Sequence, residues 1–506
     1  MLEKTEEILR PRLHWIVWAM VIAGFYLRFQ YGQLMSLNGD ETQIMLPPLL
    51  RGLWNVYQGG TLFPYGPFCN FLLHFMTFFG SSEWFFRLPS MIAGALIPYV
   101  VYRWLSETVN PAAGFAAALF LAFSRNLIHL SAEVRHYMVH TLFVACAMYC
   151  LERAFREQSP RWMRWFGISL LLALLTMYMS IWFTAAIGVY ALIRIVRGEL
   201  PRNLTIGWIG FQVAAGAICV IAYVTHLSKL RGSSGEEFAR NGWLKESYYH
   251  PESQDLFEFL TSATNALFGY VFSEPSLGAW MMAAFAVGLG LLAVRGPGRL
   301  RALSLILPLA ATATAASLGV YPYGGSRHDV FLSIFVTAGV GVALAAMVRQ
   351  KAALLVLAGA LWLPMWPTAH HFLDHHPHLN SIAQIREMLA YLEALSPRPG
   401  VLVTDESGSF ILRYYLCKGK LEDERVLAPD LKTCRCAGHT ILYSKQWSLK
   451  EEELEVILDR GLQQDRERFP MPAWIFRPTD NGSDVPAPPG PDGGFFGRMH
   501  LLRTSR

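Results

Sequence analysis

Charged side chains are scarce in this sequence. Asp, Glu, Lys and Arg make up 16% of the 506 residues, whereas an ordinary soluble protein is about a quarter charged. Hydrophobic residues make up 53%, and the mean hydropathy is +0.29. This balance excludes an ordinary soluble protein and indicates an integral membrane protein. The formal net charge of +5 does not indicate a nucleic-acid partner, because the Lys and Arg residues cluster in short loops instead of lining one face.

Cysteine is scarce as well, with seven residues in the chain. Six of them fall into two groups. Cys146, Cys150 and Cys219 lie in apolar segments, where packing is the expected role, and Cys417, Cys434 and Cys436 lie in the C-terminal part. An oxidising compartment would permit one disulfide in that part. Cys434 and Cys436 are too close for a comfortable mutual bridge, so Cys417 with one of them is expected. Three cysteines at these spacings do not make a zinc site by themselves.

Apolar runs near the roughly 20 residues needed to cross a bilayer recur along the chain. About eleven spans are predicted, at 13–31, 88–105, 112–130, 136–151, 166–181, 182–196, 205–227, 277–294, 302–320, 329–348 and 351–369. The first is too long for the apolar region of a cleavable signal and lacks a small-residue cleavage site, so we expect a retained span.

Basic residues are concentrated in alternate loops, which the positive-inside rule places in the cytoplasm. These loops contain Lys4, Arg10, Arg12, Arg103, Arg153, Arg156, Arg161, Arg164, Arg194, Arg197, Arg202, Arg295, Arg299, Arg301, Arg349 and Lys351. The outer loops are then 32–87, 131–135, 228–276, 321–328 and everything after about 370. The sequence predicts a protein of the plasma (inner) membrane, with its N-terminus in the cytoplasm and its C-terminal part outside.

The composition changes after His370, which predicts two domains. Residues 1–369 would form the membrane domain, and residues 370–506 a small extracytoplasmic α/β domain. The elements expected in the second domain are a helix over 382–395, a buried strand over 400–405 and a second helix over 410–416. Such alternation of helix and strand is typical of an α/β domain.

Two adjacent carboxylates, Asp40 and Glu41, follow the first span. The segment between them and the next acidic residue, Glu83, is apolar and rich in aromatic residues. A carboxylate held against such a surface is poorly solvated and can be tuned as a base, and a solvated helix cap is the alternative. Residues 42–57 and 68–79 are predicted to form interfacial helices with apolar faces in the lipid. A hydrophobic re-entrant plug is the alternative there.

Two further outer loops carry cations. Charges such as Glu133 and Arg135, where two spans meet, are costly unless they are paired or functional. Arg135 fits a phosphate because its planar fork matches two oxygens, and a surface pair with Glu133 is the alternative. Arg327 and His328 follow a Gly-Gly pair, whose backbone can approach a ligand closely, and precede a helix, which favours anions. Asp329 is expected to orient one of these two cations.

Several stretches resemble the GT-C membrane glycosyltransferases. They are residues 39–41, 65–67, 72–74, 82–90 and 131–137, the last being similar to the family's Glu-x-Arg-x-Tyr element. The likeness is greatest to the bacterial branch related to the protein O-mannosyltransferases and the lipid A aminoarabinose transferase. It is good up to about residue 150, fair to 348 and weak beyond 370.

The resemblance implies a mainly α, polytopic helix bundle and an enzyme that transfers a hexose or pentose from a polyprenyl-phosphate donor outside the cytoplasm. Asp40 would deprotonate the acceptor hydroxyl, with inversion at the anomeric carbon, and Glu41 would support the site. The implied substrate-binding residues are Tyr65, His74, Glu133, Arg135, Lys229, Arg231, Tyr323, Arg327 and His328. Fixed cations near the departing lipid phosphate would lower the barrier as its charge grows. The acceptor would be a glycan, a lipid or a protein.

Two features leave alternatives open. The polar loop 228–276, which carries Lys229 and Arg231, fits either a lid that orders on substrate binding or a plain solvated loop. In the histidine run 370–378, His371 and His375 would share a helix face, a spacing that can bind a metal, although such runs more often mark a membrane interface. Glycosyl transfer from a lipid phosphate needs no metal, so we expect no required cofactor, with a divalent metal as the alternative.

Two other classes of protein compete with an enzyme. A transporter or flippase of lipid-linked saccharides would also have many spans and cationic outer pockets. Transporters, however, place polar residues at the bilayer midplane and contain internal repeats, whereas here the ionisable residues lie mainly at outer span ends and no repeat is found. A receptor-like scaffold would account for the C-terminal domain but would leave Asp40 and Glu41 without a role.

Overall fold

The computed structural model describes residues 12–61, 63–232, 234–242, 244–294 and 298–347, and then 382–394, 402–404, 406–416, 426–427, 440–444, 462–464 and 473–478. Two compact units make up the chain. The first comprises Met1–Phe29, Phe63–Cys69 and Arg87–Trp366, and the second Gln30–Leu62, Asn70–Phe86 and Pro367–Arg506.

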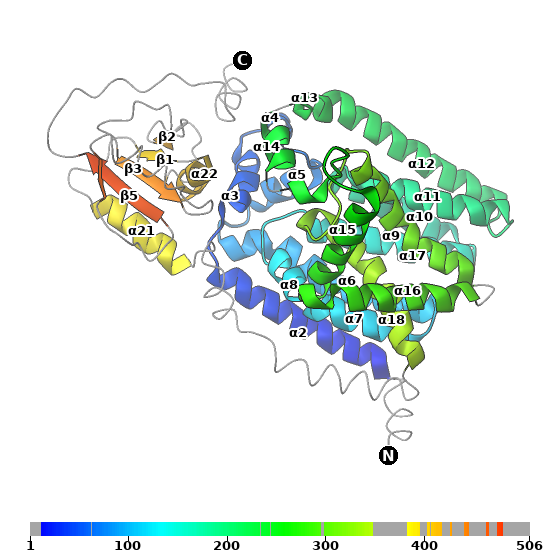
Figure 1. Cartoon of the computed structure of the whole chain (residues 1–506). Coiled ribbons are helices and arrows are strands. Elements are labelled where there is room, and N and C mark those ends of the chain that lie inside the picture. The colour runs from blue at the N-terminus through cyan, green and yellow to red at the C-terminus, as the bar shows by residue number, and fades with distance from the viewer. Residues whose placement is uncertain are drawn as a thin grey trace. The chain divides into compact units, whose positions relative to one another are not determined.

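Long apolar helices build most of the first unit (Figure 1). They are α2 (Leu13–Leu34), α6 (Glu83–Thr108), α7 (Pro111–Phe123), α9 (Tyr137–Glu157), α10 (Pro160–Thr176), α11 (Ser180–Val196), α12 (Arg202–Ala222), α15 (Leu256–Val271), α16 (Gly278–Val294), α17 (Gly298–Ser317) and α18 (Ser333–Met347). Shorter helical segments join them: α8 (Arg125–Ser131), η3 (Tyr223–Leu227), α13 (Ser228–Leu230), α14 (Ser234–Asn241), η4 (Lys245–Ser247), η5 (Pro275–Leu277) and η6 (Arg327–Leu332).

Helices lie over ten of the eleven predicted spans, whereas α15 forms in a segment that was predicted as an outer loop. Within the described residues, six helical segments are long and apolar enough to cross a membrane, or seven if α7 and α8, which meet at a 60° bend, form one span. The crowded predicted pair at 166–196 separates into α10 and α11. The segment 351–369 lies outside the described residues. The mainly helical, polytopic architecture is therefore confirmed.

Small residues let the central helices approach closely. α18 packs against α7 and α16. A Cβ atom at Gly288 would lie 2.0 Å from the carbonyl oxygen of Gly339, and one at Gly341 would lie 2.6 Å from that of Ala113. Membrane helices pack through such residues because lipid supplies no hydrophobic drive between them. α18 is consequently buried among its neighbours and holds η6, which precedes it, firmly in place.

A buried arginine ties α2 to the end of α7. The Arg28 guanidinium donates hydrogen bonds to the carbonyl oxygens of Gly24 (2.9 Å), Ala122 (3.2 Å) and Leu121 (3.5 Å). Carbonyls at a helix C-terminus have no partner within the helix and attract a cation. This contact supports the bend between α7 and α8, and therefore the segment that follows α8.

The first outer loop belongs mostly to the second unit and contains α3 (Gly39–Met45), η2 (Pro47–Leu49), α4 (Leu53–Gly60) and α5 (Phe68–Met76). The single helix predicted over 42–57 is wrong, because Pro47 starts a separate turn and Gly52 adopts a φ of +83° that favours glycine. Trp54 and Phe79 are well exposed, as an interfacial location requires.

The C-terminal elements form the predicted α/β arrangement. α21 (Ile382–Ala394), β1 (Leu402–Thr404) and α22 (Glu406–Tyr415) match the three predicted elements and share a small apolar core. The remaining strands are β2 (Val426–Leu427), β3 (Thr440–Ser444), β4 (Leu462–Gln464) and β5 (Ala473–Pro478), in the sheet order β2-β1-β3-β5-β4. β1 pairs in parallel with β2 and β3, whereas β5 is antiparallel to β3 and β4. The predicted disulfide lies outside the described residues.

Candidate functional site

The two carboxylates at the start of α3 have different surroundings. Asn38 is the N-cap of the helix: its side chain accepts from the Glu41 amide (2.9 Å), while the Glu41 carboxylate accepts from the Asn38 amide (3.1 Å). This reciprocal capping box occupies Glu41, which is buried. Asp40 is partly exposed and plays no part in the box. The helix-cap interpretation therefore holds for Glu41, although that cap is not solvated, and Asp40 remains the candidate base.

A tyrosine from the C-terminal part holds the loop before α3. The Tyr415 hydroxyl accepts a hydrogen bond from the Leu37 amide (2.8 Å) and donates one to Glu83 (2.8 Å). α22, which ends at Tyr415, packs against α3. No local pattern in the sequence indicates this contact, because 378 residues separate Leu37 from Tyr415. The α/β part of the second unit thus positions the helix that carries Asp40.

We expect Tyr415→Phe to lower stability by about 1–3 kcal/mol, since a buried backbone donor and a carboxylate both lose their partner. The thermal midpoint of the purified protein measures this effect. Tyr223→Phe, which removes the hydroxyl of an exposed tyrosine in η3, is the control. An equal effect of the two substitutions would contradict the proposed role of the Tyr415 hydroxyl.

His74 also makes a structural contact within the second unit. Its Nδ1 lies 2.7 Å from the carbonyl oxygen of Pro48. A carbonyl only accepts, so Nδ1 carries the proton and donates. The ring is buried, with Phe75 and Phe78 edge-on to it. His74 thereby joins α5 to the turn at η2, and its predicted role in substrate binding stays a prediction.

In the first unit, aromatic rings connect three segments that are distant in sequence. Tyr65 stacks on His136, with ring centroids 4.9 Å apart, and His136 contacts Tyr137 at 4.3 Å. Tyr137 in turn meets His328 edge-on at 5.7 Å. The structure therefore brings together the predicted site residues Tyr65 and His328. His136 and Tyr137, which link them, lie inside a recognised motif but were not predicted as site residues.

Gly66 allows Tyr65 to reach this position. Its amide donates to the Thr176 carbonyl at the end of α10 (3.1 Å), and a Cβ atom would lie 2.0 Å from the Leu175 carbonyl oxygen. We expect Gly66→Ala to lower stability by about 1–3 kcal/mol through overpacking, as measured by thermal unfolding. Gly210→Ala is the matched control, because nothing lies within 4 Å of a Cβ atom there. A similar loss in both variants would contradict the tight docking of this turn.

Glu133 and Arg135 form a pair that is buried instead of lying at the surface. Arg135 Nε lies 3.6 Å from Glu133 Oε2, and the two residues are 9% and 5% exposed. His129 approaches the other Glu133 oxygen at 3.7 Å. The Arg135 guanidinium also faces the Tyr137 ring at 5.9 Å. Arg135 is thus held beside Glu133 and Tyr137, and a planar guanidinium in such a buried position is of the kind that binds a phosphate.

The third predicted segment folds as a tight turn ahead of η6. Gly324 has a φ of +138°, and its amide donates to Asp329 Oδ2 (2.8 Å). The Tyr321 hydroxyl donates to the His328 carbonyl (2.8 Å). Tyr323 is buried, its hydroxyl shares a hydrogen bond with Thr264 of α15 (3.0 Å), and burial raises its pKa to about 12. Asp329 thus fixes the turn that presents Arg327 and His328, and Tyr323 anchors the turn to α15.

Burial sets the protonation of this cluster. Desolvation, reinforced by Arg135, Arg327 and neighbouring imidazoles, lowers the pKa of His136 well below its usual value, so the ring is neutral at pH 7. Desolvation raises the pKa of Tyr65 well above its usual value, with Arg135 opposing the shift. Arg135 and Arg327 are therefore both close enough to His136 to lower its pKa. Because the His136 ring is neutral, these two arginines supply the positive charge of the cluster.

The lowered pKa of His136 predicts a pH-dependent stability. Below a pH of about 6.5, the unfolded chain binds a proton at this residue that the folded chain does not, so stability falls as the pH falls. We expect the thermal midpoint of His136→Asn to drop less than that of wild type between about pH 7 and pH 5. Equal drops in the two proteins would contradict a buried, neutral imidazole.

Lys229 and Arg231 make no contact with the rings of this cluster among the residues that the structure describes. Both are exposed near the end of α13, and no side-chain hydrogen bond or ion pair of theirs is found within the described residues. His226, which precedes them, contacts the Tyr178 hydroxyl at 3.1 Å. The loop 228–276 is not irregular throughout: α14 and α15 form within it, and α15 packs against α16. The plain solvated loop is therefore wrong for α15, and the lid that orders on substrate binding stays a prediction.

Metal ligands are not gathered in the part of the chain that the structure describes, where no group of three His, Cys, Asp or Glu residues is arranged to hold an ion. The histidine run at 370–378 lies outside that part. Asp40, Glu41 and His74 belong to the second unit, and all the other predicted site residues belong to the first.

Comparisons with known proteins bear on the fold and on part of the sequence. Residues 65–227 match the sequence model of a family described as dolichyl-phosphate-mannose-protein mannosyltransferase. No curated protein matches the chain. Among solved structures, the chain is similar to ArnT from Cupriavidus metallidurans bound to undecaprenyl phosphate. The TM-score is 0.55 and the identity 14%, over 93% of this chain and 99% of that one.

A weaker likeness extends to the oligosaccharyltransferase AglB from Archaeoglobus fulgidus. Its TM-score is 0.46 at 12% identity, over 78% of this chain and 63% of that one, and nothing is inferred from it. The match to ArnT shows a shared fold, and the family match includes Tyr65, Glu133, Arg135 and His136. The resemblance to GT-C membrane glycosyltransferases seen in the sequence is confirmed at these two levels.

Proposed function

We propose that this GT-C-fold protein is an integral membrane glycosyltransferase that uses a polyprenyl-phosphate-linked sugar as donor and an extracytoplasmic hydroxyl as acceptor. The observation that carries the proposal is a pair of arginines, the buried Arg135 and the partly buried Arg327, whose charges both act on His136 of the Tyr65–His136 stack. Arginines that are wholly or partly buried among neutral aromatic rings are suited to a phosphate, because hydrogen bonds to an anion strengthen where water is excluded. The structurally similar ArnT was solved with undecaprenyl phosphate bound, which supports this donor class.

In the proposed reaction, the acceptor oxygen attacks the anomeric carbon as the bond to the lipid phosphate breaks, and the configuration inverts. The proton of the acceptor hydroxyl passes to Asp40, which is partly exposed and is not a member of the capping box that Asn38 and Glu41 form. The two arginines stabilise the negative charge that develops on the departing phosphate. Gly324 and Asp329 maintain the turn from which Arg327 projects. No metal is assigned a step in this scheme.

The test is a transfer assay with purified protein in proteoliposomes and a panel of polyprenyl-phosphate sugars. We expect one donor to be consumed, with release of polyprenyl phosphate and with slow loss of sugar to water when no acceptor is present. The same vesicles report transport, because a donor protected inside becomes accessible to a periodate probe if it crosses the bilayer. Passage of an intact lipid-linked saccharide without consumption would overturn the enzyme proposal in favour of a flippase.

A further inference from the structure

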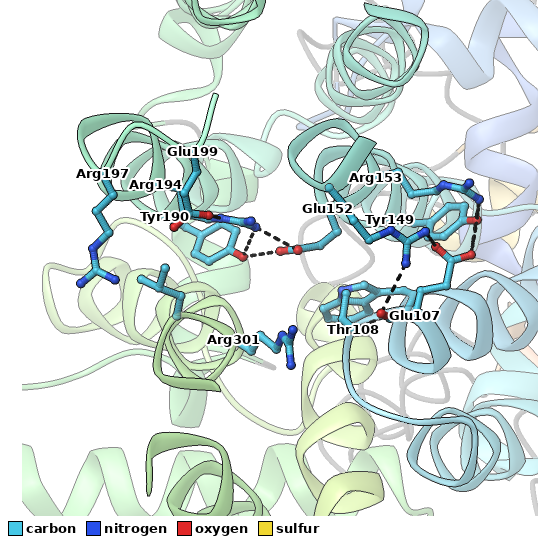
Figure 2. A pocket seen from close by; sticks show the side chains of 13 residues that line it. Glu107, Thr108, Tyr149, Glu152, Arg153, Tyr190, Arg194, Arg197, Glu199 and Arg301 are labelled. Carbon is cyan, nitrogen blue, oxygen red and sulfur yellow. Dashed lines mark hydrogen bonds and ion pairs between the residues drawn. The ribbon is translucent and has the colours of Figure 1, made fainter. Parts of the chain in front are cut away.

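A second polar pocket lies in the first unit, at the other ends of the helices that support the candidate site. Its volume is about 300 Å³, and it is formed where the ends of α6, α9 and α11 meet the start of α17 (Figure 2). Arginines and glutamates dominate its lining: Glu107, Glu152, Arg153, Arg156, Arg194, Arg197, Glu199 and Arg301. α9 has Arg135 just before its first residue and Glu152 to Arg156 in its last turns. Since an α-helix rises about 1.5 Å per residue, roughly 25–30 Å separates the pocket from Arg135.

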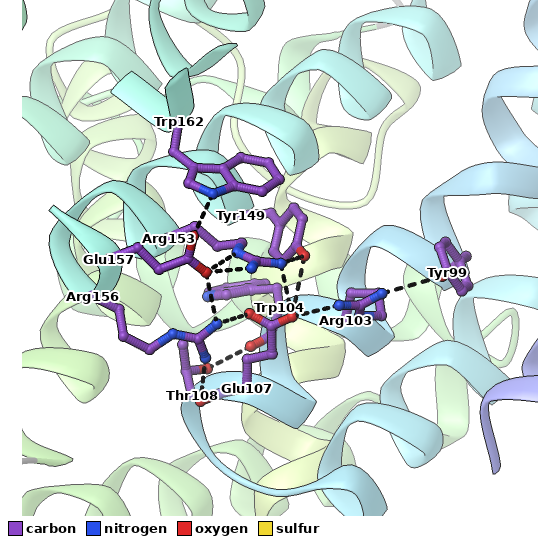
Figure 3. A network of polar contacts seen from close by, with 10 residues as sticks. All are labelled: Tyr99, Arg103, Trp104, Glu107, Thr108, Tyr149, Arg153, Arg156, Glu157 and Trp162. Carbon is purple, nitrogen blue, oxygen red and sulfur yellow. Dashed lines mark hydrogen bonds and ion pairs between the residues drawn. The ribbon is translucent and has the colours of Figure 1, made fainter. Parts of the chain in front are cut away.

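One carboxylate of the pocket is already saturated by arginines. Glu107 accepts from Arg103 (2.7 Å), Arg156 (2.5 Å) and Arg153 (3.3 Å), as Figure 3 shows. Arg153 also binds Glu157 and lies over the Trp162 ring at 4.4 Å. These contacts hold the guanidinium groups of Arg153 and Arg156 in fixed positions at the wall of the pocket.

The other two carboxylates share a single arginine. Arg194 donates to Glu152 (2.9 Å) and to Glu199 (2.7 Å), and it lies over the Phe155 ring at 4.0 Å. Tyr190 donates to Glu152 as well. All three glutamates that line the pocket therefore have arginine partners.

Two arginines of the pocket remain without such partners. Within the residues that the structure describes, neither Arg197 nor Arg301 forms an ion pair, and Figure 2 shows no dashed line to either. The lining contains five arginines and three glutamates, which leaves an excess of two positive charges. Arg197 is exposed and Arg301 is partly buried. The positive-inside rule accounts for their charge but not for their place in the lining of one pocket, where an anionic ligand would neutralise both.

We propose that this pocket binds a phosphate-bearing anion. Its volume is at the lower end of that of small-molecule sites, which are about 300–1,000 Å³, so it fits a single phosphate with a small substituent and not a long chain. Basic pockets between membrane helices on the cytoplasmic side bind lipid headgroups, and the positive-inside distribution assigns this end to that side. The occupant is thus either the phosphodiester of an anionic lipid headgroup or a soluble phosphate compound.

Native mass spectrometry of the purified protein, mixed with equal amounts of phosphatidylglycerol and phosphatidylcholine, tests the proposal. We expect wild type to retain the anionic lipid about tenfold over the zwitterionic one, and Arg197→Gln/Arg301→Gln to lose that preference. Arg202→Gln/Arg299→Gln is the control: it removes the same charge from exposed residues of α12 and α17 that do not line the pocket. Thermal midpoints without added ligand show whether each variant folds.

A second experiment, thermal unfolding with added inorganic phosphate, tests whether the occupant of the pocket is a soluble phosphate compound. If inorganic phosphate raises the thermal midpoint of wild type but not of Arg197→Gln/Arg301→Gln, while no lipid is preferred, the occupant is a soluble phosphate compound and the proposal stands. Equal behaviour of wild type and this double variant in both arms would overturn it. Because neither arm measures glycosyl transfer, the result is independent of the proposed function.

Discussion

Asp40→Asn is expected to reduce glycosyl transfer by at least about a hundredfold, with little change in folding. The substitution keeps the size of the side chain and removes its ability to take a proton, and general-base catalysis typically contributes a factor of about 10²–10⁴. Asp40 is the residue of the pair to which the structure assigns no capping contact. The measurement is the initial rate of transfer with the donor that the panel identifies, at saturating donor.

Glu41→Gln is the matched control for this prediction. A glutamine at this position can keep the capping box with Asn38, so the variant should fold and lose less than about tenfold of the activity. A large loss in Glu41→Gln together with near-normal transfer by Asp40→Asn would reverse the assignment of the base. Comparable small losses in both would show that neither carboxylate accepts the proton.

Neutralising Arg135 or Arg327 is expected to have the second largest effect. Loss of one fixed charge-stabilising group commonly costs about 10²–10³-fold in rate, and we expect that range for Arg327→Gln. Arg135→Gln would in addition leave Glu133 buried without its cation, which costs about 3–5 kcal/mol of stability. The double variant Glu133→Gln/Arg135→Gln removes both charges and separates the loss of rate from the loss of stability.

Arg125→Gln serves as the control for the arginine series, because Arg125 is exposed at the start of α8 in the same part of the first unit. Its transfer rate should stay within a factor of about two, as is usual for surface substitutions. Arg135→Lys keeps the charge but lacks the planar fork, so it should recover only part of the activity. Normal rates in Arg327→Gln and in the folded double variant would contradict phosphate binding by this cluster.

Hydropathy alone was sufficient to predict most of the helical architecture, because a membrane span must satisfy its backbone internally and leaves a long apolar run in the sequence. Hydropathy does not predict where a helix is interrupted. The helix predicted over 42–57 ends at Pro47, and α7 and α8 bend by 60° between two apolar halves. Such breaks depend on tertiary partners such as Arg28, whose contacts no local pattern specifies.

The charged residues of the candidate site were predicted from the sequence, because charges near a membrane are costly. The aromatic contacts, and the contacts between residues that are distant in the sequence, were not. Arg135, Arg327 and His328 stood out as charged groups at the ends of spans, and the structure places them within electrostatic reach of one imidazole. Tyr137 and Tyr415 did not, because aromatic residues are common throughout an apolar chain. The pairing of Tyr415 with Leu37 depends on a packing of α22 against α3 that sequence periodicity does not encode.

The central claim is tested most directly by counting released polyprenyl phosphate and transferred sugar in the same reaction, for wild type and for Asp40→Asn. The account predicts equal amounts of the two products with wild type, a sugar of inverted anomeric configuration, and at least about a hundredfold less of both with Asp40→Asn. Transfer by Asp40→Asn at the wild-type rate, or a donor that stays intact with every acceptor class, would contradict it.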